Sequence, residues 1–268
     1  MLLHPISLLL LSFSALNTHA PAPTSNAPLS APQVKSSAIK SDADELVDRL
    51  VQNATALHSI LPSITAHEVV HTDTSRGIFR RHSQGEGTVR VSRVASGGSL
   101  KETHEMTGRD GKPIASDDQK GAAQLADGFI GPQDMFFSRR NRPCFSFALA
   151  PQPTKDDPLL LHIGLSPEYA SLPQCPSGLQ GLTGIALVDP ATRQLTHLER
   201  TIPAAGDALV RVVSTDYAPS SVGDKTFWLP ALTLSSGAQG KTRVFTAVYY
   251  SDYHQYAATV TVLTAASR

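Results

Sequence analysis

The chain has 268 residues, 41% of them hydrophobic, and its 23 basic and 23 acidic residues give a formal net charge of +0. This length allows one sizeable domain or two small ones, with enough residues to bury a core. The charge balance provides no long-range attraction for a polyanion, and no basic run with interleaved aromatic residues is present, which argues against nucleic-acid binding.

The first twenty residues are typical of a signal peptide. An apolar run from Ile6 to Leu16 is followed by small residues, and no acidic residue precedes Asp42. The run is too short to span a bilayer, and Ala20 and Ala22 are two candidate cleavage positions. We therefore expect residues 1–20 to direct export to the periplasm or out of the cell, with a retained anchor as the alternative.

A linker and then a helix follow the signal. Residues 21–41 are rich in Pro, Ser and Ala, which predicts a disordered linker. The next stretch, "SDADELVDRLVQNATALHSILP", has acidic residues in its first turn, apolar residues at helical spacing and Pro62 at its end. Ser41 or Asp42 can cap the helix. Its apolar stripe predicts an amphipathic helix that covers a core.

Beyond Pro62 the sequence is typical of short antiparallel strands. β-Branched residues are frequent, and the turn signals "GEG", "SGG" and "RDGK" separate extended runs. "LTGIALVDPATRQLTHLERTIP" predicts a hairpin around Asp-Pro-Ala-Thr-Arg, and further strands follow it as far as "AATVTVL". Residues 116–129 predict a short helix and residues 129–143 a loop. We expect a single domain over residues 42–265.

The pentapeptide "HEVVH" at residues 67–71 matches a zinc-hydrolase pattern in which two histidines hold the metal and the glutamate is the general base. On a helix the two histidine Cα atoms would lie about 6 Å apart, whereas on a strand they lie about 13 Å apart, too far to share one ion. The β-branched neighbours and the upstream Pro62 favour a strand. We therefore predict a coincidental match, with no metal and no cofactor. A zinc hydrolase using His67, Glu68 and His71 is the alternative.

The chain has two cysteines, Cys144 and Cys175. An even pair in an exported protein is usually bonded, and closing a loop of about thirty residues contributes roughly 3–4 kcal/mol of stability. Neither cysteine lies in the setting of a reactive thiol. We predict a structural disulfide.

Six stretches carry a resemblance to a known family: "ELVDRLVQNATALHSILPSITAHE", "RDGKPI", "NRPCFSFALAP", "GIALVDPATRQLTHLERTIP", "STDYAPSSVGDKTFWLP" and "YYSDYHQY". In this order, over most of residues 43–260, they resemble secreted acidobacterial proteins with the LolA/LppX-like fold. The resemblance implies an α+β, mostly antiparallel β protein: a curved, incomplete β-barrel with the N-terminal amphipathic helix packed on its concave face. It implies carriage of lipid or lipoprotein acyl chains, and it brings no catalytic residues.

Aromatic residues are concentrated near the C-terminus, where eight of the sixteen follow residue 216. Strand alternation would place Trp228, Leu232 and Leu234 on one face, and Phe245 and Tyr249 likewise. These five residues are candidates to line an apolar ligand cavity, and packing into the core is their alternative role.

The sequence as a whole therefore predicts an exported, monomeric, non-enzymatic carrier or binder of a lipid or acyl chain in the cell envelope. An envelope interaction module with no ligand cavity is a further alternative.

Overall fold

The structure, a computed structural model, describes residues 41–93, 100–114, 131–203 and 211–256. The chain divides into two compact units, 1–39 and 40–268, and all described residues belong to the second unit. The predicted signal peptide, the predicted linker up to residue 40, the predicted helix at 116–129 and the last predicted strand lie outside the described residues. No helix among the described residues is long and apolar enough to cross a membrane.

Helix α1 (Asp42–Ile60) confirms the prediction of a leading amphipathic helix. Ser41 is its N-cap, and the Ser41 hydroxyl accepts a hydrogen bond from the Asp44 backbone N–H at 3.2 Å. The buried residues of α1 recur at helical spacing: Leu46, Val47, Leu50, Val51 and Ala54. After Ile60 the backbone becomes extended at Leu61, just before Pro62.

Helix α3 (Gly131–Phe137) lies where the sequence predicted a loop, so that prediction was wrong. The reason is tertiary: Phe136 and Phe137 are both completely buried, and the Phe136 ring lies 4.9 Å from the ring of Phe145, centroid to centroid. A seven-residue segment has too little periodicity to predict a helix, and burial of two aromatic side chains supplies the stabilisation that local propensity lacks.

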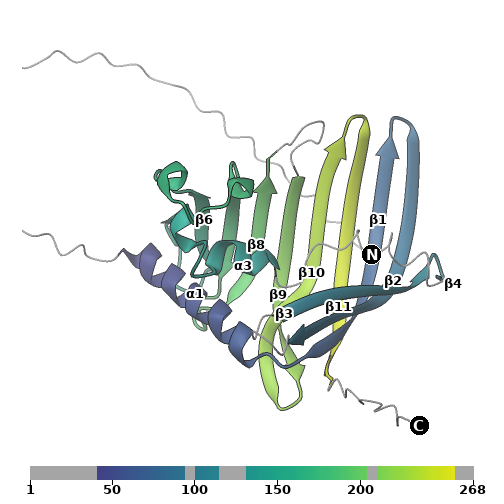
Figure 1. The fold of residues 1–268 in the computed structure, drawn as a ribbon, viewed down its shortest axis with the longest axis horizontal. Helices are drawn as coiled ribbons and strands as arrows, with labels where there is room; N and C mark the ends of the chain where they lie inside the picture. The colour runs from purple at the N-terminus through teal and green to yellow at the C-terminus, as the bar shows by residue number, and fades with distance from the viewer. Residues whose placement is uncertain (1–40, 94–99, 115–130, 204–210, 257–268) are drawn as a thin grey trace, which may run out of the picture. The chain divides into compact units, whose positions relative to one another are not determined.

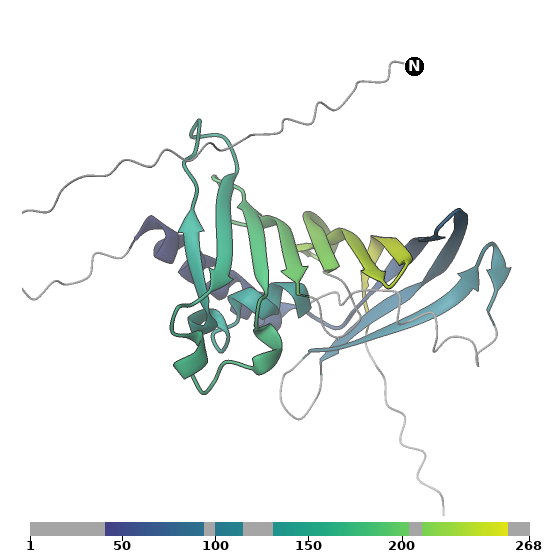
Figure 2. The ribbon, with the colours of Figure 1, turned by 90° about the horizontal axis from the view of Figure 1, so that it is seen from above.

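All the strands of the described residues belong to one antiparallel sheet, which has eleven strands in the order β4-β3-β2-β1-β11-β10-β9-β8-β7-β6-β5. They are β1 (Ile64–Arg76), β2 (Phe79–Arg93), β3 (Leu100–Arg109), β4 (Lys112–Pro113), β5 (Phe145–Leu149), β6 (Leu159–Leu165), β7 (Thr183–Val188), β8 (Leu195–Ile202), β9 (Arg211–Val222), β10 (Lys225–Gln239) and β11 (Thr242–Gln255). Figures 1 and 2 show the strand direction turning steadily across a curved sheet that does not close into a barrel. The predicted α+β, mostly antiparallel class is confirmed.

The pairing of β1 with β11 holds the sheet together at its middle. Every other pair joins strands that follow each other along the chain, whereas β1 and β11 come from opposite ends of the described region. Val70 of β1 lies opposite Val248 of β11. Removing this one pairing would separate the β1–β4 group from the β5–β11 group.

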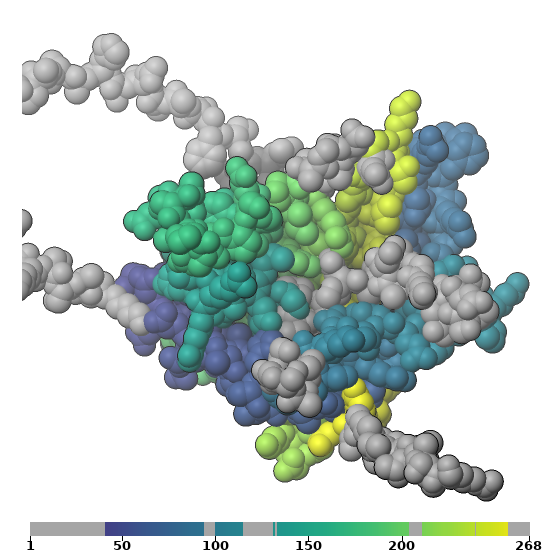
Figure 3. All heavy atoms as spheres, in the orientation of Figure 1, coloured from purple at the N-terminus to yellow at the C-terminus, as the bar shows by residue number. Residues whose placement is uncertain are grey.

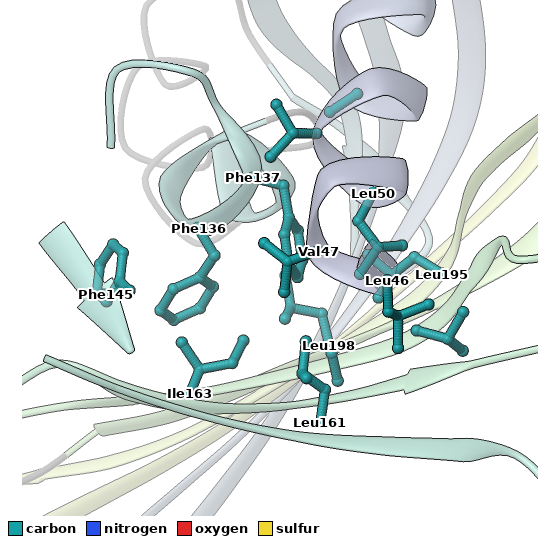
Figure 4. Close-up of a cluster of buried hydrophobic side chains, with 14 of the residues drawn as sticks. Leu46, Val47, Leu50, Phe136, Phe137, Phe145, Leu161, Ile163, Leu195 and Leu198 are labelled. Atoms are coloured by element: carbon teal, nitrogen blue, oxygen red, sulfur yellow. The ribbon is translucent and has the colours of Figure 1, made fainter. Parts of the chain in front are cut away.

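Helices α1 and α3 cover one face of the sheet, which we call the inner face. Figure 4 shows Val47 and Leu50 of α1 and Phe136 of α3 above Leu161 and Leu198 of the sheet. The largest buried cluster lies here and contains residues of α1, α3, β5, β6, β7, β8 and β9. The predicted packing of the helix on the concave side of the sheet is confirmed.

The strand register extends the inner face from β8 to β1. Leu198 lies opposite Thr215, Thr215 opposite Thr233, and Thr233 opposite Val248, which in turn faces Val70. Residues paired in this way point to the same side of the sheet. A second buried cluster occupies this end and consists of Leu61, Ile64, Ala66, Val70, Val89, Val91, Met106, Val222, Phe227, Leu229, Val248 and Tyr250.

Cys144 and Cys175 form the predicted disulfide, with their Cα atoms 5.6 Å apart. Three short 3-10 helices accompany it: η3 (Arg142–Cys144), η4 (Tyr169–Ser171) and η5 (Ser177–Leu179). Cys144 is completely buried in the cluster beneath α1. The bond therefore anchors the long β6–β7 connection to the core.

Candidate functional site

The pentapeptide at residues 67–71 lies within strand β1, which confirms the predicted extended backbone. His67 is paired with Ser251 and His71 with Ala247, so both histidines point to the outer face, opposite to α1. Glu68 points to the inner face, where it is completely buried. The glutamate thus lies on the other side of the sheet from both imidazoles and cannot act as a base on a ligand that they hold.

The two histidines have unrelated neighbours. The His67 Nε2 atom lies 3.5 Å from Glu86 Oε1, and the His71 ring makes an edge contact with Tyr249 at 5.7 Å between ring centroids. Within the ranges that the structure describes, no cluster of three or more His, Cys, Asp or Glu side chains could hold a metal ion.

Glu68 belongs instead to a buried row of charged groups on the inner face. His104 Nδ1 lies 2.8 Å from Glu68 Oε2, and His104 Nε2 lies 2.6 Å from Glu102 Oε1. The exposed fractions of the three side chains are 0% for Glu68, 11% for His104 and 19% for Glu102. Because each ring nitrogen faces a carboxylate, both can donate only if the imidazole is protonated.

The two carboxylates decide the charge of His104. Burial by itself lowers the pKa of His104, but the hydrogen bonds and charges of Glu102 and Glu68 outweigh burial and raise it to about 9. Tyr250 lies opposite Glu68, and burial together with these carboxylates raises the pKa of Tyr250 well above its ordinary value. At neutral pH the row therefore holds a cationic imidazole between two carboxylates.

Sequence reasoning missed this row. The only local signal is the alternation of Glu102, His104 and Met106 in β3, which places all three on one face. The partner Glu68 is 36 residues away from His104, and only the β1–β2–β3 register brings the two together.

Four of the five predicted cavity residues do lie together, on the outer face. Leu232 is opposite Tyr249, Leu234 is opposite Ala247, and Phe245 is opposite Ser236. Phe245 is 42% exposed and Tyr249 is 49% exposed. They form an open apolar strip, which we call the outer strip, on the face of the sheet that α1 does not cover.

The fifth residue, Trp228, does not share a face with Leu232 and Leu234, so that prediction was wrong. The register between β9 and β10 shifts at Pro230/Leu232, a bulge that reverses the alternation of the strand. Trp228 is opposite Pro219, whereas Leu232 is opposite Asp216, three residues away along β9. Trp228 packs against the cluster beneath α1.

A groove of about 1550 Å³ lies where the β1/β2 hairpin ends beside the β10/β11 hairpin, and we call it the hairpin groove. Its lining includes the apolar Ala238, Val244 and Phe245, and the cationic Arg80, Arg81, Lys241 and Arg243. Phe245 also belongs to the outer strip, so the two features are continuous. Asp73 is the acidic residue in the lining, and its carboxylate is 2.8 Å from His82 Nδ1.

The fold and this site define a class: an open antiparallel sheet with its core beneath two helices and an amphiphilic groove at its end. No protein-family model matches the chain, and no curated protein matches it. The chain is, however, similar to solved structures. A LolA superfamily protein from Nitrosomonas europaea is 11% identical, with 80% of this chain and 94% of that chain covered and a TM-score of 0.36. A DUF1329 family protein from Desulfovibrio piger is 8% identical, with 80% and 94% covered and a TM-score of 0.43.

The LolA superfamily, which the sequence resemblance named, is thus among the structures to which this chain is similar. At such identities and TM-scores the likeness gives no argument about ligand or activity.

Proposed function

We propose that this chain is an exported, non-catalytic binder of an amphiphile, a lipid or other acylated molecule, that acts as a monomer in the cell envelope. The observation that carries the proposal is the hairpin groove, in which exposed apolar side chains lie beside cationic ones. Val244 is 36% exposed and Phe245 is 42% exposed. Apolar surface of this kind suits an acyl chain, and guanidinium groups suit an anionic head group.

The outer strip offers the acyl chain a path away from the groove. Phe245 and Tyr249 are four residues apart on the same face of β11, which corresponds to about 13 Å along the strand. Leu232 and Leu234 flank them on β10. The sequence predicted that these four residues line a cavity; we propose instead that they contact the ligand on an open face of the sheet.

The position of Glu68 supports a non-catalytic role. A zinc hydrolase would need His67, Glu68 and His71 around one ion, and the strand places Glu68 on the opposite face from both histidines. Metal analysis of the purified chain tests this alternative directly. Stoichiometric zinc that is lost in His67→Ala would support the hydrolase and contradict our proposal.

Titration of the purified chain with cis-parinaric acid, a fluorescent fatty acid, tests the proposed binding. We expect saturable binding that Phe245→Asp weakens at least tenfold, because a carboxylate would then face both the acyl chain and the fatty-acid head. Ile60→Asp is the matched control, since Ile60 is 55% exposed on α1, and should leave binding unchanged.

Native mass spectrometry of the gently purified chain gives the second readout, and we expect a retained acylated ligand. A chain that neither binds the fatty acid nor retains such a ligand would contradict the proposal and favour an interaction module without a ligand. Equal binding by Phe245→Asp and Ile60→Asp would overturn the assignment of the groove.

A further inference from the structure

The turn between β1 and β2 exposes two adjacent apolar side chains. Ile78 is 91% exposed and Phe79 is 75% exposed, the highest values among the large hydrophobic residues that the structure describes. Arg76 is paired with Phe79 across the turn, and Gly77 adopts a φ of +62°, so Ile78 lies at the apex of a two-residue hairpin loop. We call residues 76–81 the tip.

No part of the described fold covers the tip. Neither Ile78 nor Phe79 belongs to a buried cluster, and neither lines the hairpin groove. Polar residues are the usual choice for an exposed hairpin loop. Two large apolar side chains at a convex apex gain nothing from folding, because the apolar surface that they carry stays in water.

The surroundings of the tip are strongly cationic, although the chain as a whole is neutral. The tip itself carries Arg76, Arg80 and Arg81. The adjoining β10/β11 turn carries Lys241, and Arg243 follows it at the start of β11. Residues 74–85 and 225–251 contain no Asp or Glu. Because β1 pairs with β11, the two turns lie beside each other at one end of the sheet, as Figures 1 and 3 show.

The two acidic residues that flank residues 74–85 in the sequence each lie beside a histidine. Asp73 is 2.8 Å from His82 Nδ1, and Glu86 is 3.5 Å from His67 Nε2. The five cationic side chains are therefore not balanced by carboxylates within the two turns.

We propose that the tip docks on an anionic phospholipid membrane, with Ile78 and Phe79 inserted at the level of the head groups and the arginines and Lys241 bound to lipid phosphates. Apolar side chains surrounded by cationic ones are the pattern of an interfacial membrane contact. A polyanion such as nucleic acid would use the cations but not the two exposed apolar side chains. Arg80, Arg81 and Lys241 also line the hairpin groove, whereas Ile78 and Phe79 lie outside its lining, so the two apolar side chains distinguish this membrane contact from ligand binding in the groove.

The test uses a fluorescent reporter placed at the tip itself, so that any other membrane-binding segment of the chain does not confuse the result. Phe79→Trp is mixed with vesicles of equimolar phosphatidylcholine and phosphatidylglycerol that carry brominated acyl chains, which quench inserted tryptophan. Ile60→Trp is the matched reporter, and the wild-type chain gives the background of Trp228. We expect strong quenching and a blue shift for Phe79→Trp, neither for Ile60→Trp, and little of either with phosphatidylcholine alone.

Charge variants test the electrostatic part. Each Lys or Arg at an anionic surface changes binding about fivefold, so Arg80→Gln/Arg81→Gln in the Phe79→Trp chain should weaken vesicle binding by on the order of tenfold or more. Arg139→Gln/Arg140→Gln is the matched control, because Arg139 and Arg140 are also adjacent and exposed, and should change nothing. Added salt should weaken binding as the Arg80→Gln/Arg81→Gln pair does.

Three results would overturn the proposal. If the tryptophan fluorescence of Phe79→Trp is never quenched, whether or not the chain binds vesicles, the tip does not insert. Equal quenching at positions 60 and 79 would show that the contact is not at the tip. A blue shift that grows with protein concentration in the absence of vesicles would mean that a second copy of the chain covers the tip.

A double variant distinguishes the tip from the hairpin groove. If Ile78→Ser/Phe79→Ser leaves parinarate binding unchanged, the two sites are separate.

Discussion

At the scale of single residues, Glu68 is a completely buried carboxylate on the inner face. Its Oε2 atom is 2.8 Å from His104 Nδ1, while its Oε1 atom has no hydrogen-bond partner in the structure. Buried ion pairs add little net stability, but removing one partner leaves the other charge buried without compensation. Replacing Glu68 should therefore lower the stability of the fold markedly.

We expect Glu68→Ala to lower the free energy of unfolding by about 3–5 kcal/mol, because His104 then keeps a buried positive charge with one carboxylate fewer. Glu105→Ala is the control: Glu105 is 44% exposed and pairs with the exposed Arg90, so its loss should cost less than about 1 kcal/mol. Urea unfolding followed by circular dichroism measures both. If Glu68→Ala and Glu105→Ala lower the free energy of unfolding equally, the buried row stabilises the fold no more than an exposed ion pair does.

The same row makes stability depend on pH. The pKa of His104 is raised to about 9 in the folded chain, against about 6.5 when unfolded. The folded state therefore holds the proton more tightly, and this stabilisation is complete below about pH 6.5 and is lost as the pH rises through 9. We expect the free energy of unfolding to fall by about 2–3 kcal/mol over this interval.

Urea titrations at a series of pH values measure this dependence, and His104→Gln is the comparison. The variant should be less stable at pH 7 and should lose most of the slope between neutral and alkaline pH. A slope that survives the substitution would assign the effect to another group.

At the scale of elements, α3 depends on a glycine in the strand beneath it. A Cβ atom at Gly184 of β7 would lie 2.8 Å from the Glu199 carbonyl oxygen and 2.9 Å from Cζ of Phe136. Both contacts are too short, so an alanine here forces β8 or the Phe136 ring to move. The absence of a side chain at position 184 is what lets Phe136 reach the inner face.

We expect Gly184→Ala to lower the free energy of unfolding by about 1–3 kcal/mol through overpacking. Gly178→Ala is the matched control, because a Cβ atom there would meet nothing within 4 Å. Chemical denaturation of both variants provides the measurement. If Gly184→Ala leaves the free energy of unfolding unchanged, this contact does not hold α3 in place.

At the scale of the whole molecule, the β1–β11 pairing decides how the sheet behaves as a unit. Strands β1 and β11 are paired on both sides, while β4 and β5 are the sheet edges. β11 also contributes Val248 and Tyr250 to the second buried cluster. Opening the centre therefore disrupts packing on both sides of it, whereas an edge strand can open alone.

We expect hydrogen exchange to be slowest in peptides from β1 (Ile64–Arg76) and β11 (Thr242–Gln255), and clearly faster in β5 (Phe145–Leu149). Exchange followed by mass spectrometry at neutral pH measures this order, with the urea-unfolded chain as the reference. Exchange of β11 as fast as that of β5 would show that the central pairing is not the stable unit of the sheet.

Local chemistry in the sequence determined several features by itself. The apolar period and the Ser41 cap specified α1, the β-branched residues around position 69 specified an extended pentapeptide, and "DPATR" specified the β7/β8 hairpin. The disulfide followed from there being only Cys144 and Cys175 to pair. The helix, the strand and the hairpin depend on interactions between residues close in sequence, and two cysteines can form only one intramolecular pair.

The tertiary structure alone decided the rest. The bulge at Pro230/Leu232 separated Trp228 from Leu232, and the direction of the sheet placed Phe245 and Tyr249 on the open face instead of beneath α1. The short helix α3 forms because two aromatic side chains find a core to enter. The pairing of β1 with β11, the row through His104 and the joining of two cationic turns all depend on partners far apart along the chain. Local propensities contain no information about such partners, because strand register and packing are set only when the whole sheet assembles.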